Sequence, residues 1–405
     1  MSSELKLGIQ SLIEDCLPLL TGKRIGVVSN HTGVTPELEH LVDMLYFKLH
    51  LDIKAIFAPE HGFRGDMPEG FSVESYIDER TQVPVHSLYG ARLKPPKDIL
   101  DELDVLIYDI QDVGARFYTY ISTLFYVLEA AGENRIEVVI LDRPNPITGA
   151  RIEGPVLDKR YRSFVGIWEI PIRHGMTVGE LALLFNREAG LNANLKVYRM
   201  TGWNRGMWFD ETGLPWVPPS PNMPCLTTAI VYPGMCLLEG TNISEGRGTT
   251  KPFELMGAPW IDNYKLVEEL KSLPLRGVKF RPSTFIPRYR KYESQLCRGL
   301  QIHVTDRNVL ESVKLGLAII WAVERIHPDK LQFNVECYED TLGCSICGVG
   351  GSSVKLRARY YFDCLTGNDI IRKLIEDGCE FKEIAKLCDE VEHFEKIRGR
   401  YLLYD

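Results

Sequence analysis

Residues 59–66, Pro-Glu-His-Gly-Phe-Arg-Gly-Asp, place four ionisable side chains directly behind an apolar run with strand character. In an open α/β sheet, ligands bind just beyond the carboxyl ends of the strands. Glu60 and His61 at such a strand end could supply a proton, a base and an oriented hydrogen bond, so we predict that both are catalytic. Arg64 is predicted to bind substrate. The alternative is a polar turn in which Glu60 caps a helix and His61 is solvated.

Three further apolar runs end in polar residues in the same way: residues 24–29 precede Asn30 and His31, residues 103–109 precede Gln111, Asp112 and Arg116, and residues 136–142 precede Arg143. Continuous apolar runs are typical of strands buried on both faces of a parallel sheet. Helical patterns lie between them, at 36–50 and 117–132. This alternation indicates βαβ units in a doubly wound sheet, whose polar strand ends would share one edge and form one cleft.

The fold class predicted is therefore α/β, with a Rossmann-like doubly wound parallel sheet in residues 1–224. Within it, Thr177 and Glu180 have the spacing of a capping box at the start of a helix. A proline-rich connector, residues 214–224, ends this domain. Residues 225–405 mix strands and helices without βαβ rhythm and are predicted to be a smaller α+β domain, with a last helix at 381–396.

A second polar block, residues 238–250, opens this second domain. Its glycines allow the backbone to approach a ligand closely. Glu239, Asn242, Glu245 and Arg247 offer both signs of charge, and we predict that they form the other wall of a substrate pocket. The alternative is a turn-rich loop whose side chains satisfy its own backbone.

Composition excludes several classes of protein. The chain has 405 residues, 45% apolar and 25% charged, and a net charge of −8, which argues against a nucleic-acid partner. No apolar run reaches the roughly 18 residues that span a bilayer. The amino terminus has no signal-peptide pattern, so we expect a cytoplasmic protein without a membrane partner. No oligomeric state is predicted.

No cofactor is predicted, because the chain has neither a GxGxxG motif after its first strand nor a P-loop. No metal site is predicted either. Cys344 and Cys347 have zinc-knuckle spacing, but Cys337 and Cys364 lie at irregular distances from them. One CxxC without a matching second pair is a weak metal signal, and a glycine-rich surface loop is favoured for this segment.

Long blocks of the sequence resemble one known family. The blocks are PEHGFRGD, YDIQDVGARFYTYISTL, LDRPNPITG, EGP, HGMTVGELA, GLPWVPPSPNMP, YPG and LLEGTNISEGRGTTKPFELMGAPW. They are similar to the exo-β-N-acetylmuramidase family, long catalogued as a domain of unknown function, from about residue 22 to residue 367. Residues 332–361 match no pattern of that family.

The resemblance implies release of N-acetylmuramic acid from the non-reducing ends of peptidoglycan fragments, in the service of cell-wall recycling. It also implies that Glu60, the glutamate of the PEHG block, is the catalytic residue. The expected partner is a small carbohydrate, either a muropeptide or a glycan fragment. Two alternatives remain: a non-catalytic muropeptide sensor, and a metal-dependent amidase or deacetylase using His31, His61, His174 and Asp109.

Cleaving a glycosidic bond needs a carboxylic acid and usually a second carboxylate. Glu60 would be the acid, and Asp112 is the predicted partner, with Asp109, Glu153, Glu239 and Glu245 as open alternatives. Retaining, inverting and substrate-assisted mechanisms all stay open. The lactyl carboxylate of the sugar needs a cation, for which arginine is well suited. The predicted substrate-binding residues are Asn30, Arg64, Gln111, Arg116, Tyr118, Arg143, Glu239, Asn242, Glu245 and Arg247.

Overall fold

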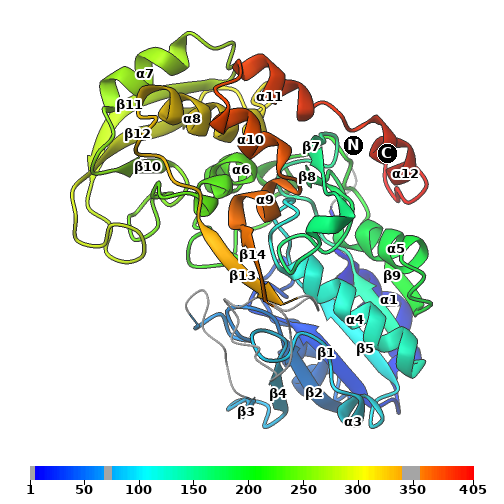
Figure 1. Ribbon diagram of the computed structural model, residues 1–405. Helices are drawn as coiled ribbons and strands as arrows, with labels where there is room; N and C mark the ends of the chain where they lie inside the picture. The colour runs from blue at the N-terminus through cyan, green and yellow to red at the C-terminus, as the bar shows by residue number, and fades with distance from the viewer. Residues whose placement is uncertain (1–4, 68–74, 340–355) are drawn as a thin grey trace.

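The computed structural model describes residues 5–67, 75–339 and 356–405. Its first half (described residues up to 224) is built on a seven-stranded sheet of order β3-β4-β2-β1-β5-β6-β9 (Figure 1). The strands are β1 (Ile25–Ser29), β2 (Ile53–Ala58), β3 (Tyr76–Ile77), β4 (Pro84–Ser87), β5 (Val105–Asp109), β6 (Glu137–Leu141) and β9 (Asn194–Tyr198). All neighbouring pairs are parallel except the edge pair β3–β4. The six parallel strands follow the Rossmann order, which confirms the predicted fold class.

Helices cover both faces of this sheet. One face carries α1 (Gly8–Leu20), α2 (Leu41–Asp43) and the π-helix η1 (Met44–Lys48); the other carries α3 (Lys97–Leu100), α4 (Tyr120–Asn134) and α5 (Val178–Glu188). Neighbouring strand residues such as Val27 and Val28 are buried in the separate cores on the two faces. Apolar side chains are needed on both sides of each strand, which explains the continuous apolar runs.

Local sequence signals predicted the start of α5 correctly but not the start of the helical segment that contains α2 and η1. The capping box is confirmed, because the hydroxyl of Thr177 accepts from the backbone of Glu180 and the Glu180 carboxylate accepts from the backbone of Thr177. The predicted helix at 36–50 is wrong at its start. Leu38 has φ +65° and is 55% exposed, and the helical segment begins only after His40.

The second half (described residues from 225) is α+β, as predicted. Its antiparallel sheet has the order β10-β12-β11, and β13 and β14 form a separate hairpin. The elements are α6 (Leu226–Met235), β10 (Leu255–Ala258), α7 (Asn263–Lys271), β11 (Val278–Phe285), β12 (Cys297–Val304), α8 (Ser312–Ile326), β13 (Val335–Glu339), β14 (Leu356–Tyr360), α9 (Tyr361–Thr366), α10 (Ile370–Glu376), α11 (Phe381–Leu387) and α12 (Glu392–Arg398). The 3₁₀ turn η4 (Cys236–Gly240) also belongs to this half. The smaller elements of the first half are β7 (Glu153–Val156), β8 (Pro171–Arg173) and the 3₁₀ turns η2 (Lys159–Tyr161) and η3 (Phe209–Thr212).

The last predicted helix is wrong, because it is divided into α11 and α12. The carbonyl of Cys388 accepts from the backbone N–H of Gly154 at 2.9 Å and is therefore engaged outside a helix at the break. Beyond α12 the chain returns to the first half, where the Tyr404 hydroxyl donates to Asp142 at 2.6 Å. Figure 1 shows the two termini on the same side of the molecule.

The two halves are packed into one body. A single apolar core extends from the sheet and α4 into α6, α8 and α9. The division at residues 224 and 225 accordingly stays a prediction. The two halves therefore meet at a fixed interface, which we call the joint. Side chains from both halves can line one site there, because no flexible linker separates them.

Candidate active site

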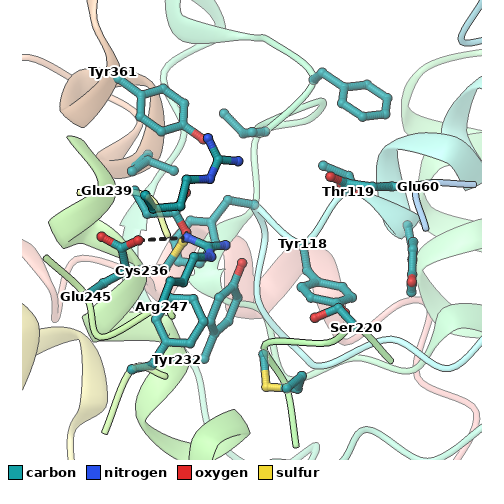
Figure 2. Close-up of a pocket in the computed structure, with 18 of the residues that line it drawn as sticks. Glu60, Tyr118, Thr119, Ser220, Tyr232, Cys236, Glu239, Glu245, Arg247 and Tyr361 are labelled. Carbon is teal, nitrogen blue, oxygen red and sulfur yellow. Dashed lines mark hydrogen bonds and ion pairs between the residues drawn. The ribbon is translucent and has the colours of Figure 1, made fainter. Parts of the chain in front are cut away.

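A cavity of about 320 Å³ lies at the joint between the halves (Figure 2). The first half lines it with Glu60, His61, Tyr89, Phe117, Tyr118, Thr119, Tyr120, Phe164, Val165, Ser220 and Met223. The second half adds Tyr232, Cys236, Glu239, Glu245, Arg247, Phe253, Arg290, Lys291, Asn334, Tyr361 and Leu365. In Figure 2, Glu60 and Thr119 lie on one side and Glu239, Glu245 and Arg247 on the other. The wall is therefore aromatic, with carboxylates contributed by both halves.

Glu60 reaches this cavity because β2 ends two residues earlier, at Ala58. His61 and Gly62 then take left-handed backbone conformations, with φ of +74° and +77°. Left-handed φ costs a residue other than glycine roughly 1 kcal/mol, and strain of this kind is concentrated at functional sites. The His61 ring is buried, and its Nδ1 donates to the carbonyl of Met67 at 3.1 Å. The tight turn thus presents the two neighbouring side chains to one pocket.

Thr119 fixes the orientation of the Glu60 carboxyl group. Its hydroxyl donates to Glu60 Oε2 at 2.9 Å. Thr119 is the residue immediately before α4, so the start of that helix holds the donor in place. When Glu60 is protonated, the oxygen that accepts this bond is the carbonyl oxygen, and Oε1 is left to carry the acidic proton.

Replacing Thr119 with valine is expected to reduce kcat by about tenfold, because a hydrogen bond to a charged group contributes about 1.5–3 kcal/mol. Thr119→Ser keeps the hydroxyl and should behave as wild type. A Thr119→Val enzyme with the kcat of wild type would show that the contact only supports packing.

The opposite wall is an ion cluster. Arg247 Nη1 lies 2.5 Å from Glu239 Oε1 and 3.3 Å from Glu245 Oε1, and Lys291 Nζ lies 3.3 Å from Glu245 Oε2. Burial alone would raise the pKa of the Glu245 carboxyl. The charges of Lys291 and Arg247 outweigh it and hold that pKa well below its ordinary value of 4.5. Glu245 is therefore ionised at neutral pH.

Replacing Glu245 with glutamine is expected to destabilise the protein at neutral pH by about 1–3 kcal/mol, because two half-buried cations, Arg247 and Lys291, each lose one charged acceptor. The folded-state pKa is depressed, so the contribution of Glu245 is complete above pH 4.5 and is lost as the pH falls below it. Urea unfolding from neutral pH down to about pH 3 should therefore show the difference between wild type and variant shrinking with acid. A difference that is constant over this range would contradict the assignment.

Three predicted strand-end residues bond to their neighbours and do not line this cavity. Asn30 Oδ1 accepts from the Thr32 backbone and hydroxyl, and Gln111 Nε2 donates to the carbonyls of Asp112 and Pro144. Arg143 forms a buried pair with Asp109, at 2.5 Å. Residues 214–217 of the connector lie over Gln111 and Arg143. Only about 20 Å³ of space remains between the connector and these two side chains. The usual ligand position of a Rossmann sheet is filled here by the chain itself.

The other predicted residues outside the cavity also have partners within the protein. Asp112 accepts from the backbone of Gly114 and lies 3.4 Å from the buried His174 ring. Arg64 pairs with Asp43 and Asp78, and the Asn242 side chain bonds to the backbone of Lys330 and Gln332. Arg116 is completely buried and donates to the carbonyls of Pro155, Ile170 and Leu365.

The structure thus brings together six of the predicted residues: Glu60, His61, Tyr118, Glu239, Glu245 and Arg247. Among the carboxylates first considered as partners of Glu60, Glu239 and Glu245 line the cavity, while Asp109, Asp112 and Glu153 are engaged elsewhere. Sequence reasoning missed Thr119, Arg290 and Lys291. Thr119 lies inside one of the quoted blocks, and the basic run Arg288–Lys291 was the available signal for the other two.

No arrangement for a metal ion is found where the chain is described. Over residues 5–67, 75–339 and 356–405, no group of three or more His, Cys, Asp and Glu side chains is placed to hold one. His31 and His61 each bond to a backbone carbonyl. Cys344 and Cys347 lie outside the described residues, as does the side chain of Cys337, and Cys364 is buried. Within the same ranges, no helix combines the length and apolar character needed to cross a bilayer.

Two family models match the chain in succession: the N-terminal model of exo-β-N-acetylmuramidase NamZ over residues 25–227, and the C-terminal model over residues 230–404. The chain belongs to the exo-β-N-acetylmuramidase family. The peptidoglycan β-N-acetylmuramidase NamZ of Bacillus subtilis (strain 168) is 47% identical to it over 402 residues, which cover 99% of this chain and 92% of that protein.

Solved structures agree with this family assignment. One DUF1343 family protein of Bacteroides fragilis NCTC 9343 is 35% identical and superposes with a TM-score of 0.87, covering 99% of both chains. A second such protein from the same strain is 32% identical, with a TM-score of 0.74 and coverage of 100% of this chain and 99% of the other. The similarity to members of the exo-β-N-acetylmuramidase family therefore includes both halves that line the cavity.

Proposed function

We propose that this chain is an exo-acting β-N-acetylmuramidase, a glycosidase that releases N-acetylmuramic acid from the non-reducing ends of peptidoglycan fragments. The observation that carries the proposal is Glu60: a glutamate at a strand end, oriented by Thr119, in a pocket built by both halves of the family fold. We place the enzyme in the cytoplasm, where it serves recycling of cell-wall fragments. The division into residues 1–224 and 225–405 is part of this proposal.

Glu60 acts as the general acid that protonates the leaving oxygen. Its hydrogen bond from Thr119 occupies Oε2 and leaves Oε1 to deliver the proton. Glu239 or Glu245 supplies the second carboxylate, because these are the other two carboxylates that the described part of the chain places in the lining of the cavity. Of the two, Glu239 is the more accessible, with 18% of its side chain exposed against 4% for Glu245.

The balance of charge in the cavity suits an anionic sugar. Among the described residues that line the cavity, three carboxylates, Glu60, Glu239 and Glu245, are matched by Arg247, Arg290 and Lys291, although the whole chain carries a net charge of −8. A substrate carboxylate therefore meets a locally neutral site rather than the acidic average of the protein. The aromatic rings of Tyr89, Phe117 and Tyr118 supply apolar surface for the face of a sugar.

The volume of the cavity supports exo action, since about 320 Å³ is at the small end of ligand pockets and suits one terminal sugar. Two glycans test this: one ending in N-acetylmuramic acid at its non-reducing end, and one ending there in N-acetylglucosamine. The proposal predicts release of free N-acetylmuramic acid from the first and no cleavage of the second. Internal cleavage of the second glycan would contradict exo action.

A further inference from the structure

The helical segment of residues 226–240, in which η4 continues α6, presents a polar stripe to the cavity. Tyr232, Cys236 and Glu239 are spaced four and three residues apart, which places them on one face of a helix. All three line the cavity, and Figure 2 shows them on the wall across from Glu60. The other residues from 229 to 238 are apolar and buried. Packing of the core therefore does not explain why this one face is polar.

The stripe is a chain of hydrogen bonds that ends at Glu239. The Cys236 thiol donates to Glu239 Oε1 at 3.2 Å. Burial, and next the charge of Glu239, raise the pKa of this thiol well above its ordinary value of 9.0, so it keeps its proton at neutral pH. The Tyr232 hydroxyl donates to the same sulfur from the preceding turn. Because a thiol can accept one hydrogen bond while it donates another, all three groups are linked.

Arg247 contacts the same oxygen of Glu239. Its Nη1 lies 2.5 Å from Glu239 Oε1, and its guanidinium lies 4.9 Å from the centre of the Phe253 ring. Two donors on one carboxylate oxygen fix the orientation of the group, since a rotation would break both contacts. Glu239 is thus oriented by Cys236 and Arg247, much as Thr119 orients Glu60 on the other wall.

The backbone that carries Glu239 is fixed as well. At Gly234, α6 approaches α8 so closely that a Cβ atom would overlap the carbonyl oxygen of Ser312. At Gly240, the end of η4 lies against the backbone of Phe362 in α9 in the same way. Glycine is the residue that allows such close approach of two backbones. The packing sets the position of the turn, and with it the depth of the carboxylate in the cavity.

Glu245, which lines the same wall, is placed differently. Its Oε1 lies 3.3 Å from Arg247 Nη1 and its Oε2 lies 3.3 Å from Lys291 Nζ, so both oxygens contact cations of the protein. Its side chain is also more deeply buried than that of Glu239. A carboxylate that acts on the sugar must be reached by it, and Glu239 is the more accessible of the two. Glu245 instead balances the charges of the cations behind it.

We propose that Glu239 is the second catalytic carboxylate and that Cys236 is its positioning residue, an inference that rests on the proposed function. The negative charge of Glu239 faces the positive charge that develops on the sugar ring as the leaving group departs. Cys236 acts only through Glu239, by holding Oε1 in place. The acid Glu60 and the charge of Glu239 then act on the sugar from opposite walls of the cavity (Figure 2).

The first test measures Glu239→Gln on the N-acetylmuramyl–N-acetylglucosamine disaccharide and on 4-nitrophenyl β-N-acetylmuramide. Nitrophenolate leaves without a proton, so the second substrate does not need the acid but still needs the second carboxylate. We expect kcat to fall about 10²–10³-fold on both substrates. A folded Glu245→Gln protein should lose much less. Loss on the disaccharide alone, wild-type rates on both substrates, or a larger loss in Glu245→Gln would each overturn the inference.

The second test separates positioning from packing. On the nitrophenyl muramide, Cys236→Ala should lower kcat about three- to tenfold with little change in KM, as expected for the loss of one ordinary hydrogen bond. Cys236→Ser keeps a donor and should recover most of this loss. Cys388→Ala is the matched control, because it removes a buried thiol that lies outside the cavity lining. Equal kcat in Cys236→Ala and Cys388→Ala would show that the thiol does not position Glu239.

The two tests remain decisive if one variant is lost. If Glu239→Gln does not fold, the comparison of Cys236→Ala with Cys236→Ser decides: recovery by serine supports the inference, and equal rates in these two variants overturn it. If folded wild type hydrolyses neither substrate, the proposed function itself fails. That result is distinct, because every outcome against the inference alone leaves wild type active on the muramide.

Discussion

Glu60→Gln is expected to lower kcat on a β-linked N-acetylmuramyl–N-acetylglucosamine disaccharide by about 10²–10⁴-fold, the usual contribution of general acid catalysis. Glutamine keeps the size of the side chain and can still accept from the Thr119 hydroxyl, but its amide protons are not acidic enough to be transferred to the leaving sugar oxygen. The loss should be smaller on the 4-nitrophenyl glycoside, because nitrophenolate leaves without being protonated.

This difference between leaving groups separates two roles for Glu60. An acid is needed mainly for the poor leaving group, whereas a nucleophile is needed equally for both. Glu37→Gln is a suitable control, since Glu37 is an exposed glutamate of the same half that lies outside the cavity lining. Equal losses on both substrates would show that Glu60 is the nucleophile and that Glu239 or Glu245 is the acid.

Arg116→Met should be the most destabilising of the substitutions considered, at about 3–5 kcal/mol, because each buried polar group left without its hydrogen-bond partner costs about 1–3 kcal/mol. The carbonyls of Pro155, Ile170 and Leu365 would be left buried without these donors, which lie at 2.6–2.9 Å. Two of these carbonyls belong to the first half and one to α9 in the second half, so the hydrogen bonds of Arg116 connect the two halves. Urea unfolding measures the loss directly.

Arg24→Met provides the comparison, because Arg24 pairs with Asp104 at the surface, where solvent screens the pair, and its loss should change stability much less. Any Arg116→Met protein that remains folded should have an unchanged KM for the muramide. A variant with normal stability and a strongly raised KM would instead restore the prediction that Arg116 binds substrate.

The fold was predictable because its signals are local. The central strands β1, β5 and β6 lie within continuous apolar runs, and the Thr177 capping box is completed within four residues. Glu60 was predictable for the same reason. It follows the end of β2, and the strand end alone indicates that its side chain lies at the edge of the sheet. The broken last helix was not predictable, since the carbonyl of Cys388 is engaged by Gly154, more than two hundred residues earlier.

The site was only partly predictable, because its remaining parts depend on contacts between distant segments. The sequence indicated that polar strand ends share an edge, which they do, but not that residues 214–217 would lie over Gln111 and Arg143. Similarly, the sequence around Arg290 predicts only a charged side chain on a solvated loop. Its position at the cavity is set by Tyr289 and Tyr292, whose partners lie tens of residues away.

The most direct test of the central claim is release of free N-acetylmuramic acid from the N-acetylmuramyl–N-acetylglucosamine disaccharide by wild type and by Glu60→Gln, with the N-acetylglucosamine disaccharide as the second substrate. We expect wild type to cleave only the muramyl disaccharide, and the folded variant to lose this activity. Cleavage of neither disaccharide by folded wild type, or equal cleavage by the variant, would contradict it.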